Sequence, residues 1–198
     1  MGNRIITISR EYGSAGLEIA MAVAEKLGLP LYNRKILEKI AQESGYTLDF
    51  INEISEFAGS GNKFLDMLSR YDFHGNSVQD NIFEIQTKVI EDLAAEGPCV
   101  IVGRCADYIL RDNHDLLKVF LFADFDKRLE RLVNVYGPKY GEPVDNPKKR
   151  IRDRDARRKA YYYAHTDMEW GNAHNYDISL NSGVLGPEKC VEIITDLY

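Results

Sequence analysis

The chain has 198 residues, of which 44% are hydrophobic and 28% charged, which is ordinary for a globular protein with its own core. The formal net charge of −6 argues against general binding to nucleic acid or to a membrane surface. The three cysteines form no CxxC pair, which disfavours a zinc site, and no apolar run reaches the ~18 residues of a membrane span. We therefore expect one cytoplasmic domain over residues 1–198, without a membrane partner; a homo-oligomer remains open.

Strand-like and helix-like segments alternate along the chain. The predicted elements of the first half are a strand at 4–8, a helix at 16–27, an extended piece at 29–32, a helix at 33–42, two short helices within 47–71 and a long helix from Ser77 to about Gly97. Asn33 is a good N-cap residue for the helix that follows it. Ser77 is the predicted cap of the long helix.

The second half continues the alternation. Its predicted elements are strands at 99–103 and 117–122, a helix capped by Asp126, a loop at 137–147, a polar helix that begins at Asn146-Pro147, a strand at 177–181 and a helix from Pro187. This order is typical of a three-layer α/β protein, in which helices cover a parallel sheet and ligands bind at the carboxyl ends of the strands.

The segment SREYGSAGLE joins the first strand to the first helix and partly matches a phosphate-binding loop. The Walker A pattern GxxxxGK[ST] supplies a glycine turn, a lysine for the outer phosphates and a hydroxyl group for Mg²⁺. With Gly16 placed on the second glycine, Glu11 replaces the first glycine, and Leu17 and Glu18 replace the lysine and the hydroxyl residue. What remains is a backbone nest at the start of a helix, made of Gly13, Ser14, Ala15 and Gly16.

The loop by itself leaves two interpretations open, an anion site and a plain tight turn. Glu11 and Glu18 are electrostatically unfavourable beside a phosphate unless they hold a metal ion. Arg10, just past the strand, is the nearby cation that can replace the missing lysine.

Arginines follow two later strands. Arg104 leaves the sheet directly after the strand at 99–103, either as an anion ligand or as a surface residue. Arg128 and Arg131 are three residues apart and so share one helix face. They are candidates for phosphate contact, with solvation or pairing with acidic neighbours as the alternative.

The segment KKRIRDRDARRK, Lys148–Lys159, carries eight basic and two acidic residues and reverses the acidic balance of the chain. Arg150, Arg154 and Arg158 recur every four residues, which places their guanidinium groups on one side of a helix. A solvated face and a nucleic-acid contact are possible interpretations. The Gly- and Pro-rich loop before the segment favours a lid that closes over phosphates.

Together these features resemble the cytidylate kinase-like branch of the P-loop nucleoside-monophosphate kinases, from one end of the chain to the other. ITISREYGSAG is similar to the opening of that branch, in which the lysine position is commonly not lysine, and VIVGRCADYIL to its middle signature. The remaining matches are Arg128-x-x-Arg131, the lid pattern Asp155-x-x-Arg158, and the closing strand YDISLNS.

The resemblance implies a five-stranded parallel sheet, a helical acceptor-binding region over residues 33–96 and an arginine-rich lid over 137–165. It implies transfer of a phosphoryl group from ATP, with Mg²⁺, to a pyrimidine nucleoside monophosphate such as CMP; the metal ligands are not identified. The residues expected to hold the donor phosphates are Arg10, Gly13, Ser14, Ala15 and Gly16. The residues expected to bind the acceptor are Asn33, Lys39 and Arg104. The residues expected to stabilise the transferring group are Arg128, Arg131, Arg154 and Arg158.

Three charged or polar groups of related kinases are missing. Besides Leu17 and Glu18, Val102 stands where related kinases carry a metal-holding aspartate. Losing one such contact commonly costs about 10²–10³ in rate. The alternative function is therefore a nucleotide or phospho-ligand binding protein without catalysis, and a nucleic-acid-binding module is the third and least favoured.

Other reactive residue types are interpreted as structural. Cys99 and Cys190 fit apolar faces and are expected to be packing residues, and Cys105 is assigned no chemistry. One or two of the rings in Tyr161–Tyr163 are expected to pack in the core. Trp170 either borders a base pocket or covers the core.

Overall fold

The computed structural model describes residues 4–51, 78–137 and 145–198. Its sheet consists of five parallel strands, β1 (Ile5–Arg10), β2 (Leu31–Tyr32), β3 (Val100–Val102), β4 (Leu116–Phe122) and β5 (Ile178–Asn181). Their order across the sheet is β2-β3-β1-β4-β5, so the strand that carries the phosphate-loop candidate is central. The predicted three-layer α/β class with a parallel sheet is confirmed.

The helices follow the strands as the alternation predicted. They are α1 (Gly16–Leu27), α2 (Arg34–Ser44), α5 (Val78–Ala95), α6 (Ala106–Ile109), α7 (Phe125–Arg131), α9 (Pro147–Thr166), α10 (Ser182–Leu185) and α11 (Pro187–Leu197). A π-helical turn at Leu132–Tyr136 and a 3₁₀ turn at Ala173–Asn175 are also present, and residues 48–51 are helical. The short helices expected within 47–71 fall largely outside the described residues.

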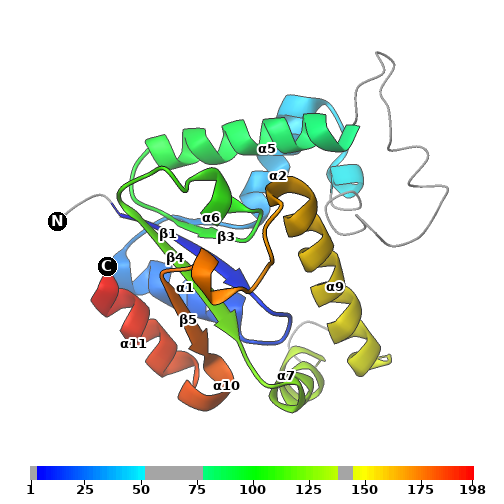
Figure 1. Cartoon of the computed structure of the whole chain (residues 1–198), viewed down its shortest axis with the longest axis vertical. Coiled ribbons are helices and arrows are strands. Elements are labelled where there is room, and N and C mark those ends of the chain that lie inside the picture. Colours follow the sequence, from blue (N-terminus) through cyan, green and yellow to red (C-terminus); the bar gives the residue numbers. More distant parts are fainter. Residues whose placement is uncertain (1–3, 52–77, 138–144) are drawn as a thin grey trace.

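Alternating side chains of the strands divide the core between the two faces of the sheet. Ile6 and Ile8 of β1 pack with α1 and α11 on one face. Ile5 and Ile101 pack with α2, α5 and α6 on the other face. In Figure 1, α5 lies across the top of the molecule, α2 crosses behind it, and α11 lies at the lower left. This burial of both faces explains why the strands are apolar almost throughout.

Asn33 occupies the predicted N-cap position of α2, although its side chain makes no capping hydrogen bond. The predicted cap of α7 differs from the structure. Asp126 lies in the first turn of α7, and Asp124 occupies the N-cap position instead. An acidic residue in the first turn is still favourable there, because the amino end of a helix carries partial positive charge. Ser77, the predicted cap of α5, lies outside the described residues.

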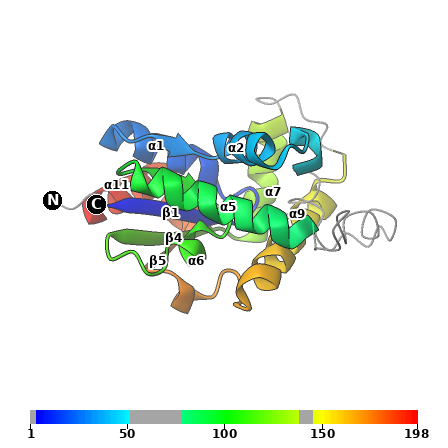
Figure 2. The same ribbon diagram turned by 90° about the horizontal axis from the view of Figure 1, so that it is seen from above.

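The polar helix α9 lies beside the carboxyl ends of the strands. In Figure 2 it is at the opposite end of the molecule from the C-terminus. β1 and β3 are paired up to Ile8 and Val102, so the segments that leave these two strands emerge side by side. α9 faces both segments, and this is where a ligand site is expected in a parallel sheet.

None of the described helices has the length and apolar character needed to cross a membrane. The division into an acceptor region at 33–96 and a lid at 137–165 stays a prediction, because residues 52–77 and 138–144 lie outside the described part. The cytoplasmic location and the oligomeric state also stay predictions.

Candidate functional site

The loop after β1 turns through residues with left-handed backbone and ends at the start of α1. Gly13 has φ 87° and Ala15 has φ 60°. The Ser14 hydroxyl donates a 2.9 Å hydrogen bond to the carbonyl of Glu11, so it braces the loop from within. Gly16 opens α1, where unpaired backbone N–H groups favour an anion.

Arg10 lies between this loop and the turn after β3. A Cβ atom on Gly16 would approach the Cβ of Arg10 to 2.5 Å, and a Cβ atom on Gly103 would collide with Nη1 of Arg10. The stem of the arginine therefore passes over the first residue of α1, and its guanidinium group lies against Gly103. The two glycines leave the space that this side chain occupies.

Five arginines meet in one cavity, here called the arginine cavity, of about 110 Å³. It is lined by Arg10, Gly103, Arg104, Arg154, Arg157 and Arg158. Burial, and then the charges of Arg158 and Arg104, hold the pKa of Arg10 well below its usual value. So many cations at one place repel one another, and a bound anion would relieve that repulsion.

Aromatic side chains form the apolar part of the arginine cavity. Tyr161, Tyr162 and Trp170 line it. Tyr162 and Trp170 are also buried in a cluster with Phe120, so Trp170 both borders the cavity and covers the core. The prediction that one or two rings of Tyr161–Tyr163 pack in the core is confirmed, because Tyr162 is buried and Tyr161 packs against the same cluster. Cys99 and Cys190 are buried in the core, as predicted.

A carboxyl group is buried next to the arginine cavity. Asp107 of α6 is 3% exposed, and it accepts hydrogen bonds from the Tyr162 hydroxyl at 2.7 Å and the Ser9 hydroxyl at 3.4 Å. Burial raises the pKa of Asp107, against the opposing effect of these hydrogen bonds. Burial also raises the pKa of the neighbouring Cys105 thiol, which makes that thiol a poor nucleophile.

The turn after β3 is held in an unusual conformation. Gly103, Arg104 and Cys105 have φ values of 71°, 62° and 54° in succession. Gln86 of α5 donates a 2.9 Å hydrogen bond from Nε2 to the carbonyl of Arg104. This turn directs the Arg104 side chain into the arginine cavity.

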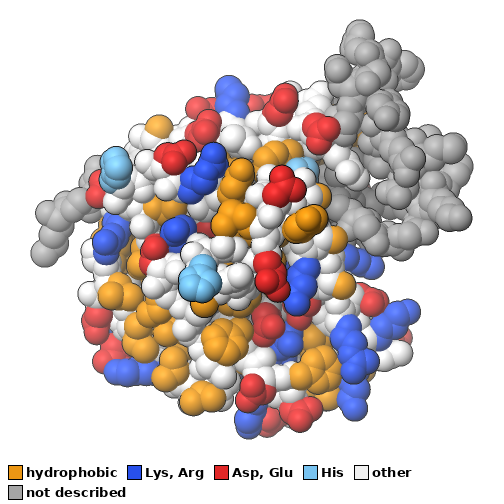
Figure 3. Space-filling model, in the orientation of Figure 1, with side chains coloured by type: hydrophobic (Ala, Val, Ile, Leu, Met, Phe, Trp, Pro, Cys, Tyr) orange, Lys and Arg blue, Asp and Glu red, His pale blue; other side chains and the backbone are white. Residues whose placement is uncertain are grey.

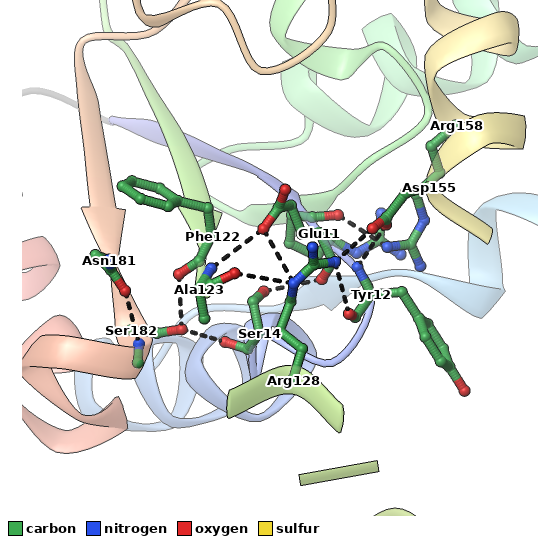
Figure 4. A network of polar contacts seen from close by, with 12 residues as sticks. Glu11, Tyr12, Ser14, Phe122, Ala123, Arg128, Asp155, Arg158, Asn181 and Ser182 are labelled. Atoms are coloured by element: carbon green, nitrogen blue, oxygen red, sulfur yellow. Dashed lines mark hydrogen bonds and ion pairs between the residues drawn. The ribbon is translucent and has the colours of Figure 1, made fainter. Parts of the chain in front are cut away.

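A network of charges connects the phosphate-loop candidate to α7 and α9 (Figure 4). Nε of Arg128 lies 3.3 Å from Glu11, and its Nη1 forms an ion pair with Asp155. Asp155 also accepts a 2.8 Å hydrogen bond from the backbone N–H of Tyr12. Arg128 is 8% exposed and donates further bonds to the carbonyls of Tyr12 and Ala123.

The two acidic residues that looked unfavourable in the loop are thus both paired with arginine. Glu11 pairs with Arg128, and Glu18 lies 3.3 Å from Nη1 of Arg131. Burial raises the pKa of Glu11, while the charge of Arg128 opposes this effect. Arg128 and Arg131, expected at the transferring group, have loop carboxylates as partners here.

The lid helix contacts the loop directly. Nη1 of Arg158 donates a 2.8 Å hydrogen bond to the carbonyl of Arg10. The Tyr12 ring lies beneath Arg154 and Arg158, whose guanidinium carbons are 5.9 and 5.7 Å from the ring centroid. The structure therefore brings together Arg10, Arg104, Arg154 and Arg158 of the predicted site residues.

Asn33 follows β2 at the carboxyl edge of the sheet, and Lys39 lies further along α2. The Lys39 ammonium lies 3.6 Å from Glu96, which precedes β3 and is at the opposite end of that strand from Arg104. Neither Asn33 nor Lys39 lines the arginine cavity. Their predicted contact with an acceptor stays a prediction.

Two further cavities extend from the arginine cavity along the loop. The loop cavity, about 260 Å³, is lined by Arg10, Glu11, Tyr12, Gly13, Gly16 and Arg158. The outer cavity, about 320 Å³, is lined by Gly13, Ala123, Arg131, Asn134, Ser182 and Gly183. Arg10 and Arg158 border both the arginine cavity and the loop cavity, and Gly13 borders both the loop cavity and the outer cavity, so consecutive cavities are neighbours.

Several site residues were not predicted from the sequence. The Ser182 hydroxyl lies 2.7 Å from the carbonyl oxygen of Ser14 and 3.0 Å from that of Phe122, shares its one hydrogen between them and so ties the end of β5 to the loop. Gln86 stands on the apolar face of α5 between Ile82 and Val89, and a polar residue at such a position is a signal that could have been noticed. Asp107 carried no comparable signal, because its burial depends on the packing of α6 and α9.

Comparison with known proteins places these observations in a family. Residues 5–184 match the family model described as the cytidylate kinase-like family. The chain is 30% identical over 190 residues to a cytidylate kinase of Archaeoglobus fulgidus, covering 96% of this chain and 91% of that protein.

Solved structures share the fold. An uncharacterized protein from Eubacterium ventriosum is similar with a TM-score of 0.70 and 24% identity, over 98% of this chain and 97% of that one. A shikimate kinase from Bacteroides thetaiotaomicron is similar with a TM-score of 0.54 and 16% identity, over the same shares of the two chains. The match over residues 5–184 and the curated relative agree with the predicted resemblance. The chain belongs to the cytidylate kinase-like family and is a phosphotransferase of the nucleotide-kinase type.

Proposed function

We propose that the protein transfers a phosphoryl group from ATP to a pyrimidine nucleoside monophosphate, with CMP as the preferred acceptor. The observation that carries this proposal is the series of three neighbouring cavities, in which Arg10 and Arg158 border both the arginine cavity and the loop cavity. A kinase must hold the donor nucleotide and the acceptor with the transferring group between them, and for a nucleoside-monophosphate kinase the acceptor is a second nucleotide. The choice of CMP rests on the relative that is named a cytidylate kinase.

The donor is assigned to the outer and loop cavities. The backbone of Gly13–Gly16 and the amino end of α1 would hold its phosphates, as the loop geometry favours. The outer cavity, between the turn after α7 and the segment after β5, has room for its nucleoside. Ser182 would keep the loop in register with β5 through its bond to the carbonyl of Ser14.

The acceptor is assigned to the arginine cavity. Arg104 and Arg154 would bind its phosphate, because guanidinium groups hold phosphate oxygens in pairs. Arg10 and Arg158 border both the loop cavity and the arginine cavity, so they are the groups best placed to stabilise charge on the transferring group. In this proposal Arg10 compensates for the missing lysine, and Arg128 positions the loop.

The arginine cavity is smaller than the ~300 Å³ at the low end of ordinary small-molecule sites. The acceptor therefore needs α9 to move outward, and its return would exclude water from the reacting groups. Tyr12, Arg154 and Arg158 make the contacts that such a movement would break and re-form.

Mg²⁺ is assigned to the triphosphate. Among the described residues no three His, Cys, Asp or Glu side chains are grouped in a way that could hold a metal ion. Of the carboxylates at the loop, Glu11 and Asp155 are paired with Arg128, and Glu18 is paired with Arg131. Mg²⁺ commonly binds through substrate phosphates and water, so the proposal routes no step through a metal held by the protein.

The decisive measurement is ADP production from ATP and Mg²⁺ with each of the common nucleoside monophosphates. We expect turnover with pyrimidine monophosphates and the highest kcat/KM with CMP. Turnover with purine acceptors alone would contradict the assignment to pyrimidines. If no acceptor is phosphorylated and calorimetry still shows ATP binding, the alternative of a non-catalytic binding protein is favoured.

Arg10→Ala tests whether Arg10 takes over the role of the lysine. We expect kcat/KM to fall by about 10²–10³, because one charged contact to the transferring group is lost. Arg111→Ala is the matched control, since Arg111 lies over the Tyr108 ring and does not line the arginine cavity. An equal effect of both substitutions, or none for Arg10→Ala, would reject the role assigned to Arg10.

A further inference from the structure

Gln86 is a polar side chain buried inside an apolar helix face. It is 0% exposed, and Ile82 and Val89 on the same face of α5 are 2% and 1% exposed. Burying an amide group is unfavourable unless its hydrogen-bonding atoms are paired. The amide of Gln86 is therefore expected to have specific partners.

Both ends of this amide are paired, and with two residues of the arginine cavity. Nε2 donates to the carbonyl of Arg104 at 2.9 Å. Oε1 accepts a hydrogen bond from the Tyr161 hydroxyl at 3.0 Å. Arg104 and Tyr161 both line the arginine cavity, whereas Gln86 does not. One buried side chain thus joins α5, the turn after β3 and α9.

The bond to Arg104 acts on a strained backbone. Arg104 and Cys105 both have left-handed φ values, which residues with a Cβ atom rarely adopt. Such conformations persist only where their surroundings hold them. The carbonyl that Gln86 binds belongs to the peptide between Arg104 and Cys105, so this hydrogen bond fixes the plane of that peptide and the direction in which the Arg104 side chain leaves the turn.

We propose that Gln86 is a positioning residue for the acceptor site: it holds Arg104 in the direction that meets the acceptor phosphate and, through Tyr161, couples that arginine to α9. This inference rests on the proposed function, since it needs an acceptor at Arg104. Gln86 acts through Arg104 and touches no substrate. Its removal should therefore affect the acceptor and leave the donor unchanged.

The test compares Gln86→Leu with Thr87→Val, a neighbour whose hydroxyl bonds within the helix to the carbonyl of Phe83 at 2.9 Å. Trp170 lines the arginine cavity and is the one tryptophan of the chain, so its fluorescence reports CMP binding without turnover. We expect Gln86→Leu to weaken CMP binding and raise the KM for CMP about tenfold, with the KM for ATP within about twofold of the wild type. Thr87→Val should leave both unchanged.

Two more variants keep the test informative if Gln86→Leu does not fold. Gln86→Glu keeps an acceptor for Tyr161 but places an oxygen against the carbonyl of Arg104, so it should weaken CMP binding as strongly. Tyr161→Phe removes the link to α9 and keeps the bond to Arg104, so its effect on the KM for CMP should be smaller.

The possible failures are distinguishable. If the wild type turns over CMP and Gln86→Leu or Gln86→Glu raises the KM values for CMP and ATP equally, or changes neither, Gln86 has only a structural role and the inference is wrong. If the wild type neither binds nor phosphorylates any nucleoside monophosphate, the proposed function fails, and this inference fails with it.

Discussion

Arg10 fills space that two glycines leave open, one in the loop after β1 and one in the turn after β3. A methyl group on Gly16 or on Gly103 would overlap the arginine. The stem of Arg10 is thus held over the loop and its charged end against the turn, close to Arg104 and Arg158. Glycine is therefore needed at both positions, because a Cβ atom at either one would displace Arg10.

Gly103→Ala tests this arrangement, with Gly28→Ala as its control. The two glycines have similar φ values of 71° and 68°, but a Cβ atom on Gly28 would meet nothing within 4 Å. Both substitutions should lower the free energy of unfolding by about 1–2 kcal/mol, because alanine is strained at such φ values. Only Gly103→Ala should also weaken binding of CMP, because it displaces the guanidinium group of Arg10.

Urea denaturation measures the first effect and Trp170 fluorescence the second. Unchanged CMP affinity in Gly103→Ala would mean that the position of Arg10 is unimportant for the acceptor. An equal loss of affinity in Gly28→Ala would mean that general destabilisation, and not the displaced arginine, is the cause.

At the scale of elements, α9 is attached to the loop through Asp155. Its carboxylate accepts the backbone N–H of Tyr12 and pairs with Arg128 of α7, so three segments distant in sequence meet there (Figure 4). The lid pattern in the sequence predicted that Asp155 and Arg158 belong together on one helix. The partners of Asp155 on other elements could not be predicted, because they depend on how α7 and α9 pack.

Asp155→Asn should loosen the attachment of α9. The amide can still accept the Tyr12 N–H, but the charge that pairs with Arg128 is lost, and we expect the free energy of unfolding to fall by about 2 kcal/mol. Hydrogen exchange should become faster in the first half of α9. Both quantities can be measured in one preparation, by urea denaturation and by mass spectrometry of exchanged peptides.

Asp153→Asn is the control for that substitution. Asp153 lies two residues away on α9 and borders a different hollow, open to solvent, so its change should stay within about 0.5 kcal/mol. An equal loss of stability in the two variants would show that the effect comes from the charge of the helix and not from the contact with the loop.

At the scale of the whole molecule, charge is distributed unevenly. The chain carries a net charge of −6, yet five arginines line one cavity. Lys and Arg side chains gather around the first part of α9 in Figure 3, while both signs are mixed over much of the rest of that face. Such a distribution attracts small anions to one place and gives little general attraction for a polyanion.

Ligand-dependent thermal stability tests that expectation. At about 100 times its Kd, ATP with Mg²⁺ should add about 2.7 kcal/mol to the free energy of unfolding, which for a chain of this length raises Tm by roughly 5–10 °C. CMP should raise Tm as well. Single-stranded RNA at the same phosphate concentration and ionic strength should not. A shift with RNA as large as that with ATP would support the nucleic-acid interpretation instead.

The fold class and the places where the chain leaves the sheet could be predicted from local patterns: apolar strands that alternate with helices, the loop Gly13–Gly16, and Arg104 directly after a strand. The family could be predicted from the resemblance of the quoted motifs to those of cytidylate kinases. Parallel strands bring their carboxyl ends to one edge, so residues at those ends could be expected to lie near one another.

The partner of each arginine became known only from the folded arrangement of the helices. Arg128 and Arg158 look alike in the sequence, yet Arg128 pairs with Glu11 and Asp155, while Arg158 reaches the carbonyl of Arg10 and lines the arginine cavity. Ion pairs and hydrogen bonds between distant segments depend on ångström-level packing of whole helices, which no spacing along the chain records. For the same reason Gln86, a single polar residue in an apolar stripe, acquires its partners only when α5 and α9 close on the turn after β3.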